Sequence, residues 1–439
     1  MQRRRLLCLA LVTALTAVPA LSQQGKNPPT NLWIDVSTHN MAGMPDMGGM
    51  MGGLGGFMAK RMAGGGAGGK PTYPTARHGA MTGQYLDMAL HNALKPGVEA
   101  QDQIPAGLNL GKSLTLIPIE PSTSTRGDTP PGKIPDVEVK ITEYWGCGAA
   151  VRAGQPKVAM FKIKGGGKTI DPKNPMGSMQ GVDFQSTGSL SKGLYVPDRD
   201  IDLQPGYVYW PNRNYGKQVP SGARLAGQHR VTGDGIPASM QFDVQQNADF
   251  MPKLMLRTQG ELADAIGLSW PGVDRARAYF ITGMHMQVLG ENSYAMTIWS
   301  SADVPGAGGE LHAYLGGNYL DKWLKQKVLL PSTATSCTIP KGIFAGTSNV
   351  KGQQAAMPGM LMMTAYGPEN WITYPPKPAD PKKPWNPEWS VRLRAKSSAT
   401  AILGMDLGNM QQMDEGEAQP QQQKKKPGMK GLLRGILGG

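Results

Sequence analysis

Apolar and polar residues alternate along much of the chain between residues 73 and 410. In DVEVKITEYW, the apolar residues Val137, Val139 and Ile141 are separated by single polar ones. A period of two residues is typical of a half-buried strand in an antiparallel sheet. The pattern recurs in SLTLIPIE, KVAMFKIK, GYVYW, SMQFDV, RAYFITGMHM, SYAMTIW and EWSVRLRAK, which are separated by turn residues. The chain is therefore predicted to be mainly β.

Helical periodicity is scarce, and one segment carries it best. In ELHAYLGGNYLDKWLKQK, Leu311, Leu315, Tyr319 and Trp323 recur every four residues. This spacing predicts one helix over residues 310–327. Alternating β and α units are absent from the pattern, which disfavours a doubly wound parallel sheet.

The patterned region is longer than one compact domain usually is. We place a boundary near residues 252–260 and predict two β-sandwich-like domains, residues 73–254 and 255–410, with the helix inserted in the second. Within that second domain, LSWPGVDRARAYFITG resembles the B and C strands of fibronectin type III-like domains. The resemblance implies that four side chains point into a sandwich core, namely Leu268, Trp270, Tyr279 and Ile281.

The two ends of the chain have a different character. Residues 1–22 join three arginines to an apolar stretch and a small-x-small site, Ala20-Leu21-Ser22, which predicts a cleaved signal peptide. Residues 23–72 form a low-complexity, Met/Gly-rich lead-in, predicted to be disordered apart from an isolated strand in TNLWIDVST. Residues 411–439 are predicted to form a disordered basic tail. After signal cleavage, no later segment is long and apolar enough to be a transmembrane helix.

Charge and export together narrow the class of partner. The chain carries 45 Lys and Arg against 32 Asp and Glu, a formal net charge of +13. A basic balance of this size favours anionic partners. Nucleic acid is not among the partners we predict, because an exported protein does not meet it. The segment YWGCGAAVRAGQP, from Tyr144 to Pro156, resembles uncharacterised exported envelope proteins of Gram-negative bacteria. That resemblance implies a location in the periplasm or cell envelope, with an anionic envelope surface or other envelope proteins as partners.

Two cysteines, Cys147 and Cys337, follow the predicted signal peptide. In an oxidising compartment two cysteines suit one disulfide, and two separately buried thiols are the alternative.

The lead-in also raises a copper hypothesis. Methionine thioethers prefer Cu(I), and a glycine-rich loop can wrap several around one ion. The stretch resembles Met-rich arms of periplasmic copper-resistance proteins, and its GGMMGG portion is similar to the flexible tail of bacterial chaperonins. The residues of this candidate site are His39, Met41, Met44, Met47, Met50 and Met51. A plain linker and a membrane or self-association contact are the alternatives; we expect no cofactor unless the copper reading holds.

The tail suggests a surface contact. As a helix it would place apolar residues beside basic ones, as interfacial membrane helices do, with a solvated basic tail as the alternative. The candidate contact residues are Lys424, Lys425, Lys426, Lys430, Arg434, Leu432, Leu433, Ile436 and Leu437.

Aromatic residues around a Pro-rich loop suggest a third site. Trp371, Tyr374 and Trp385 are candidates for stacking on sugar rings, while closure of the core is the alternative role for such side chains. This reading makes the protein a carbohydrate-binding or carbohydrate-active β protein.

Enzyme motifs are largely missing. The six histidines include no pair at i, i+4, so the HExxH zinc motif is excluded. GGGKT at 165–169 lacks the first glycine of a phosphate loop and is predicted to be a turn. Three aspartates at 198, 200 and 202 lack the glycine and glutamate of a calcium loop. A catalytic triad around His229 is left open. We therefore expect a non-enzymatic exported envelope protein with a binding or structural role, and copper binding and carbohydrate binding stay as alternatives.

Overall fold

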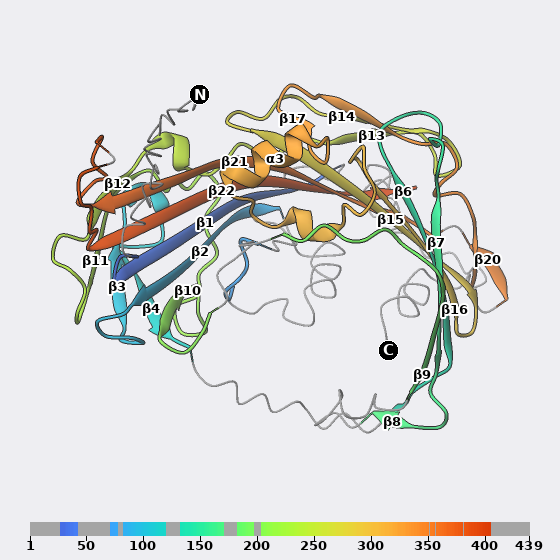
Figure 1. The fold of residues 1–439 in the computed structure, drawn as a ribbon, viewed down its shortest axis with the longest axis horizontal. Helices are drawn as coiled ribbons and strands as arrows, with labels where there is room; N and C mark the ends of the chain where they lie inside the picture. The colour runs from blue at the N-terminus through green and yellow to red at the C-terminus, as the bar shows by residue number, and fades with distance from the viewer. Residues whose placement is uncertain are drawn as a thin grey trace, which may run out of the picture.

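The computed structural model describes residues 27–42, 71–77, 82–119, 132–170, 182–196, 203–350, 352–355, 357–380 and 382–404. Nearly all of the regular structure in these residues is β-strand, which confirms the mainly β prediction. One large mixed sheet of 15 strands dominates the molecule, and its longest strands run side by side across it (Figure 1).

The strand nearest the N-terminus lies inside this sheet. Strand β1 (Thr30–Met41) pairs antiparallel with β2 (Gly83–Asn92) and parallel with β22 (Trp389–Leu403). The isolated strand expected in a disordered lead-in is therefore wrong for these residues. The reason is that this segment finds a hydrogen-bonded neighbour on each side, β2 and β22.

The remaining strands extend the sheet in both directions from β1 and β22. On the β2 side, the neighbours in order are β10 (Tyr207–Trp210), β4 (Ser113–Pro118), β3 (Ala100–Gln103), β11 (Gly227–Gly233) and β12 (Gln241–Val244). On the β22 side, they are β21 (Gly359–Tyr374), β15 (Ala278–Gly290), β16 (Ser293–Ser300), β6 (Val137–Trp145), β7 (Lys157–Lys164) and β9 (Asp183–Gly188). In Figure 1, β12, β11, β3 and β4 lie at the left, and β7, β9 and β16 lie at the right.

The sheet joins the two regions predicted to be separate domains on either side of residue 254. Strand β1 pairs with β22, and β16 pairs parallel with β6. The β6–β16 pair takes one strand from each predicted domain, and β1, from the predicted lead-in, lies between β2 of the first domain and β22 of the second. The structure therefore does not confirm a division into two sandwiches. The sequence could not reveal this, because strand pairing between distant segments leaves no trace in local sequence patterns.

Several smaller elements accompany the large sheet. A three-stranded sheet contains β13 (Arg257–Gln259), β14 (Ile266–Ser269) and β18 (Ser336–Ile339). Two-stranded sheets join β19 (Ser348–Val350) to β20 (Gln353–Ala355) and β5 (Gly132–Lys133) to β8 (Thr169–Ile170), while β17 (Leu330–Pro331) pairs with β15. The 3-10 turns are η1 (Ala106–Leu108), η2 (Gln246–Ala248) and η3 (Gly309–His312).

The single α-helix among the described residues, α3 (Gly317–Lys325), is shorter than the predicted 310–327. The glycine pair Gly316-Gly317 stands at its N-terminus, where the backbone of Gly316 is extended. Glycine is a poor helix former, so the first part of the predicted segment forms the short turn η3 instead. No described helix is long and apolar enough to cross a membrane.

The large sheet has two different sides. The core face packs the main hydrophobic cluster and includes Leu32, Ile34, Val36, Leu86, Leu393 and Leu403. All four side chains expected in a core next to the Pro-Gly turn, Leu268, Trp270, Tyr279 and Ile281, are buried. The opposite side, which we call the polar face, carries the alternate residues of the same strands. It holds the features described next.

Candidate functional site

The polar face is formed at its centre by β1 and β22, on which alternate residues, most of them polar, point to the same side of the sheet. Asp35, Ser37 and His39 alternate with apolar or neutral residues of β1, and Arg392, Arg394 and Lys396 do so on β22. The parallel register sets Asp35 beside Arg394. A half-buried strand would expose these side chains, yet Asp35, Arg394 and Lys396 are all buried. We call the group made of Asp35, Asp87, His312, Arg394 and Lys396 the buried ionic strip.

Asp35 and Arg394 form the ionic centre of this strip. The Nε and one Nη atom of Arg394 donate to the two carboxylate oxygens of Asp35 at 2.8 and 2.6 Å. Two parallel charge-assisted hydrogen bonds fix both side chains. The ring of Tyr314 covers the pair, with its centroid 4.8 Å from the guanidinium carbon of Arg394.

Lys396 lies under the same aromatic ring. Its Nζ is 4.6 Å from the Tyr314 centroid and donates to the carbonyl oxygens of Arg77 and His312 at 2.9 and 2.8 Å. A buried ammonium is costly unless such donors find acceptors. Lys396 therefore ties two covering segments, one before β2 and one at η3, to the centre of the sheet.

Asp87 faces Asp35 across the β1–β2 pair. It accepts hydrogen bonds from the backbone N–H groups of Thr75 and Ala76 at 3.0 and 2.7 Å and from the Thr75 hydroxyl at 3.2 Å. Burial raises the pKa of the Asp87 carboxyl to about 8, against these bonds, and the nearby Asp35 carboxylate adds to the rise. Asp87 thus keeps its proton through neutral pH.

His312 closes the strip on the β21 side. Its Nε2 lies 2.8 Å from the hydroxyl of Thr282, and its Nδ1 lies 2.8 Å from that of Thr364. Burial lowers the pKa of His312 to about 3, and the neighbouring Lys396 and His39 add to the fall. The imidazole is therefore neutral, so one ring nitrogen donates to a threonine hydroxyl and the other accepts from one. A network of this kind positions the covering segments on the sheet.

Towards the β10 end, the polar face changes from ionic to aromatic. We call Trp33, His91, Tyr207, Tyr209 and Trp371 the aromatic row. The strand registers align Trp371, Arg392, Trp33, Ala89 and Tyr209 across five neighbouring strands. Neighbouring rings touch: the Trp33 and Tyr207 centroids are 5.8 Å apart and nearly parallel, and those of His91 and Tyr207 are 4.9 Å apart.

Towards the β9 end, the polar face becomes apolar. We call strands β6, β7, β9 and β16 the wing. Their registers place a set of apolar side chains on one side, namely Val137, Val139, Ile141, Phe161, Ile163, Phe184, Tyr294 and Met296. Phe184 on the edge strand β9 is 60% exposed, and the rest of this set is partly exposed. The other side of the same strands carries the Glu138–Lys162 ion pair, at 3.3 Å.

The three residues predicted to stack on sugars do not come together. Trp371 lies on the polar face over Arg392, at 5.7 Å from its ring centroid to the guanidinium carbon. Tyr374 stacks on the buried Trp389, which belongs to the core face. Trp385 donates from Nε1 to the carbonyl of Pro375 in the loop. An odd separation of three residues along β21 sends Trp371 and Tyr374 to opposite sides of the sheet.

Of the copper candidates, the structure describes His39 and Met41, which are buried strand residues of β1. The His39 ring packs edge-on against Tyr85, with centroids 5.7 Å apart. Met44, Met47, Met50 and Met51 lie outside the described residues, as do the tail residues from Lys424 to Leu437 and the aspartates at 198, 200 and 202. Within the described part of the chain, no three His, Cys, Asp or Glu side chains gather as a metal site.

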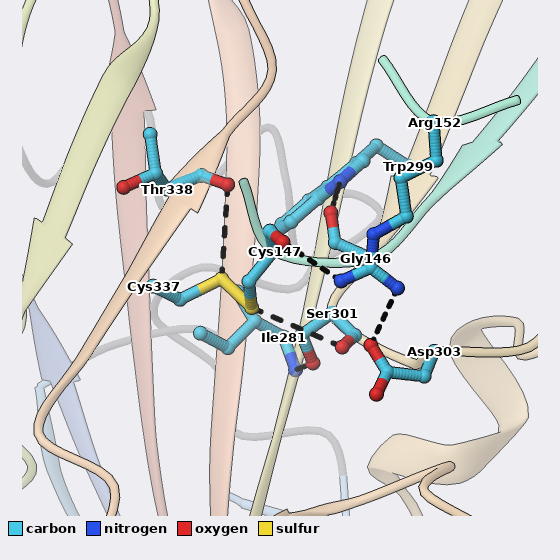
Figure 2. Close-up of a disulfide and its surroundings, with 9 residues drawn as sticks. All are labelled: Gly146, Cys147, Arg152, Ile281, Trp299, Ser301, Asp303, Cys337 and Thr338. Carbon is cyan, nitrogen blue, oxygen red and sulfur yellow. Dashed lines mark hydrogen bonds and ion pairs between the residues drawn. A yellow bond between two sulfur atoms is a disulfide. The ribbon is translucent and has the colours of Figure 1, made fainter. Parts of the chain in front are cut away.

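Cys147 and Cys337 form a disulfide across a sequence separation of 190 residues (Figure 2). The bond joins the loop after β6 to β18 of the three-stranded sheet. Around it, Arg152 donates to the Cys147 carbonyl at 2.8 Å and pairs with Asp303 at 2.7 Å. Trp299 donates from Nε1 to the carbonyl of Gly146 at 3.0 Å. These hydrogen bonds and the ion pair hold the loop around Cys147 in place beside the disulfide.

His229 has an acidic partner, although its geometry argues against a triad. Its Nδ1 lies 2.8 Å from a carboxylate oxygen of the fully buried Asp102, and its Nε2 lies 3.0 Å from the carbonyl of Leu225. Burial lowers the pKa of His229, but the hydrogen bond and charge of Asp102 outweigh burial and leave the pKa raised. The Leu225 carbonyl occupies the ring nitrogen that would face a nucleophile in a triad. The bond from His229 on β11 to Asp102 on β3 instead links these two strands. The GGGKT segment is a turn that leads from β7 to β8, as predicted.

Sequence reasoning missed the ionic strip and the aromatic row. The usable signal was the alternation of charged residues in WSVRLRAK together with the single acidic residue, Asp35, in LWIDVSTHN. Opposite charges on two strands favour pairing, but nothing local indicated that these strands are neighbours. No protein-family model matches the chain, and no curated protein matches it.

Proposed function

We propose that this is a non-enzymatic exported protein of the cell envelope with a structural or binding role. In this proposal the apolar side of the wing is the surface by which the protein joins an assembly with other envelope proteins. The observation that carries the proposal is the partly exposed apolar set on four adjacent strands, which ends at the exposed Phe184. Contiguous exposed apolar surface of this kind is typical of interaction sites.

The edge position of β9 supports the same reading. In the described residues β9 pairs on one side only, with β7, and all six of its residues are exposed. An exposed edge strand is a template on which a partner chain adds a further strand. The buried histidines favour a non-enzymatic role, because the ring nitrogens of His229 and His312 are held by protein groups. Copper binding and tail contact with an anionic surface remain separate hypotheses. Deleting 43–62, which leaves β1 whole, and measuring Cu(I) affinity tests the first; deleting 424–439 and measuring vesicle binding tests the second.

Chemical cross-linking in isolated envelopes tests the proposal with one matched pair of variants. Phe184→Asp puts a charge on the apolar side of β9, and Gln185→Asp puts the same charge on its other side. We expect wild type and Gln185→Asp to be cross-linked in a species larger than the monomer and Phe184→Asp to lose it. Cross-linking of Phe184→Asp at the wild-type level, or a purely monomeric wild type, would overturn the proposal. Mass spectrometry of the mature N-terminus tests export.

A further inference from the structure

Several methionine side chains gather on the polar face where it meets the wing. We call Met284, Met286, Met296, Met360 and Met362 the methionine patch. Between β15 and β16, Met286 is opposite Met296. Between β15 and β21, Met284 is opposite Met360, and Met362 lies two positions further along β21. All of them therefore point to one side of the sheet, and Thr282 on the same side of β15 contacts His312 of the ionic strip.

The spacing of these positions lets several sulfur atoms reach one point. Directly opposed residues of an antiparallel pair have Cβ atoms about 4.5–5.5 Å apart. Met284 and Met286, two positions apart on β15, are separated by about 7 Å along the strand. Methionine is long, unbranched and flexible, so its thioether adapts to a shared ligand. Met284, Met286 and either opposed partner can therefore place their thioethers around one ion above β15.

Sulfur is concentrated here beyond what an apolar surface requires. Strand positions favour β-branched and aromatic residues, and the adjoining strands β6 and β7 follow this preference with Val137, Val139, Phe161 and Ile163. The patch instead has methionine at neighbouring positions on three adjacent strands. Among the described residues outside it, the other methionines are buried except for Met160 and Met255. This distribution favours a role for the sulfur atoms themselves.

The donors that the patch offers are soft and uncharged. Glu143, further along β6 on the same side, is buried and already accepts hydrogen bonds from the backbone N–H groups of Ser191 and Gly306 at 2.8 and 2.9 Å. His285 points to the other side of β15, where its Nε2 lies 2.9 Å from the Met357 carbonyl oxygen. Thioether ligands select Cu(I), whereas imidazole suits Zn(II) and Cu(II). The donor set therefore selects a soft monovalent ion.

We propose that the methionine patch is a binding site for one Cu(I) ion. Met284 and Met286 supply the central thioethers, and Met296 and Met360 complete the set from the neighbouring strands. Met286 and Met360 are 40% and 37% exposed, so an ion reaches these sulfur atoms from solvent. The site goes beyond the assembly role proposed for the wing, although Met296 belongs to both. It is also separate from the copper hypothesis for the lead-in, because its ligands are residues of β15, β16 and β21.

Protection from oxidation tests the site at each residue. Hydrogen peroxide converts methionine to its sulfoxide, and a sulfur that binds a metal ion is shielded from this reaction. The probe is Ag(I), a soft ion of the same charge, added in twofold excess to the full mature chain with the Cys147–Cys337 disulfide intact, so that neither cysteine offers a thiolate. Peptide mass spectrometry should show sulfoxide formation at Met286 and Met360 slowed about tenfold. Met255, 50% exposed and outside the patch, is the internal control and should oxidise as it does without Ag(I).

A pair of double variants tests the thioethers without removing the apolar surface. Leucine keeps the volume of methionine and lacks its sulfur. In competition with a chromogenic Cu(I) chelator, Met284→Leu/Met360→Leu should bind one Cu(I) ion per chain fewer than the wild type. Met160→Leu/Met255→Leu is the matched control and should keep the wild-type stoichiometry. Circular dichroism checks that both variants are folded.

Four results would overturn this proposal: no protection of Met286 and Met360, equal protection of Met255, the same protection by Zn(II), or equal Cu(I) stoichiometry in the two double variants. Deleting 43–62 should leave the protection of Met286 and Met360 in place, and its loss would assign the ion to the lead-in. Phe184→Asp should bind Cu(I) as the wild type does, and Met284→Leu/Met360→Leu should keep the cross-linked species. Failure of the wing proposal and failure of this one are therefore distinguishable.

Discussion

Asp35 and Arg394 form a buried, two-point ion pair between residues that are 359 positions apart in the chain. The pair lies between β1 and β22, under the ring of Tyr314. Both side chains are almost fully removed from solvent, at 8% and 2% exposure. Such a pair contributes modest net stability when intact, but it is costly to break on one side only.

Asp35→Asn should therefore destabilise the protein strongly. The change leaves the Arg394 guanidinium buried with one charged acceptor fewer, which costs about 3–5 kcal/mol of unfolding free energy. Urea denaturation measures the loss. Asp234→Asn is the control, since the Lys95–Asp234 pair is exposed and such pairs contribute about 0–1 kcal/mol. Equal losses for the two variants would contradict the assigned role of burial.

Asp87 makes stability depend on pH in a defined direction. The carboxyl titrates near 3.8 when unfolded and near 8 when folded, so between these values the folded state holds one proton more. The contribution of Asp87 to the free energy of unfolding is therefore fully present at low pH and is lost as the pH rises towards 8.

Asp87→Asn removes that titration. Urea denaturation at pH 5, 6, 7 and 8 gives the unfolding free energy of both proteins. The value for the wild type minus that for the variant should fall as the pH rises. Taking the difference at each pH cancels the histidines, including His312, which titrates with the opposite sign below its unfolded pKa. A difference that is constant from pH 5 to 8 would contradict a raised pKa at Asp87.

The Cys147–Cys337 disulfide closes a loop spanning 190 positions of the sequence. Replacing both cysteines by serine should lower the unfolding free energy by about 2–4 kcal/mol, because the cross-link restricts the unfolded chain. Thermal denaturation measures the change. A reductant should lower the midpoint of the wild type and leave that of the double variant unchanged; an unaffected wild type would argue against the bond.

Gly367 is required by a close approach of two backbones. A Cβ on this residue would lie 2.7 Å from the carbonyl oxygen of Ala395, at the bulge where β21 shifts its register against β22. Gly367→Ala should cost about 1–3 kcal/mol through overpacking. Gly272→Ala is the control, since a Cβ there meets nothing within 4 Å. Similar chemical denaturation midpoints for the two variants would show that the bulge relaxes without cost.

The sequence predicted the class of fold well because strand periodicity is local. The strands β6, β7, β16 and β22 lie in segments identified by their alternation alone. The helix α3 falls within the predicted 310–327, although it is shorter and begins at Gly317. The order of the strands in the sheet could not be predicted from the sequence, because the pairing of β1 with β22 joins residues hundreds of positions apart.

The site residues were harder to identify for the same reason. A lysine or arginine on the polar side of a strand is exposed in most proteins, so Lys396 gave no warning of its burial. Its acceptors, the carbonyls of Arg77 and His312, come from segments with no recognisable relation to β22. Trp371 was named as a candidate together with Tyr374 and Trp385, but in the sheet it is in register with Arg392 and Trp33.

The pairing of β1 with β22 also sets the order in which the molecule is completed. The central strand keeps one unpaired edge until the segment up to Leu403 has been synthesised. Folding dominated by such distant contacts is slow, and an open strand edge in a partial chain invites aggregation. A nascent chain of this protein therefore completes its central sheet only late in synthesis, and until then the open edge of β1 needs protection from other chains.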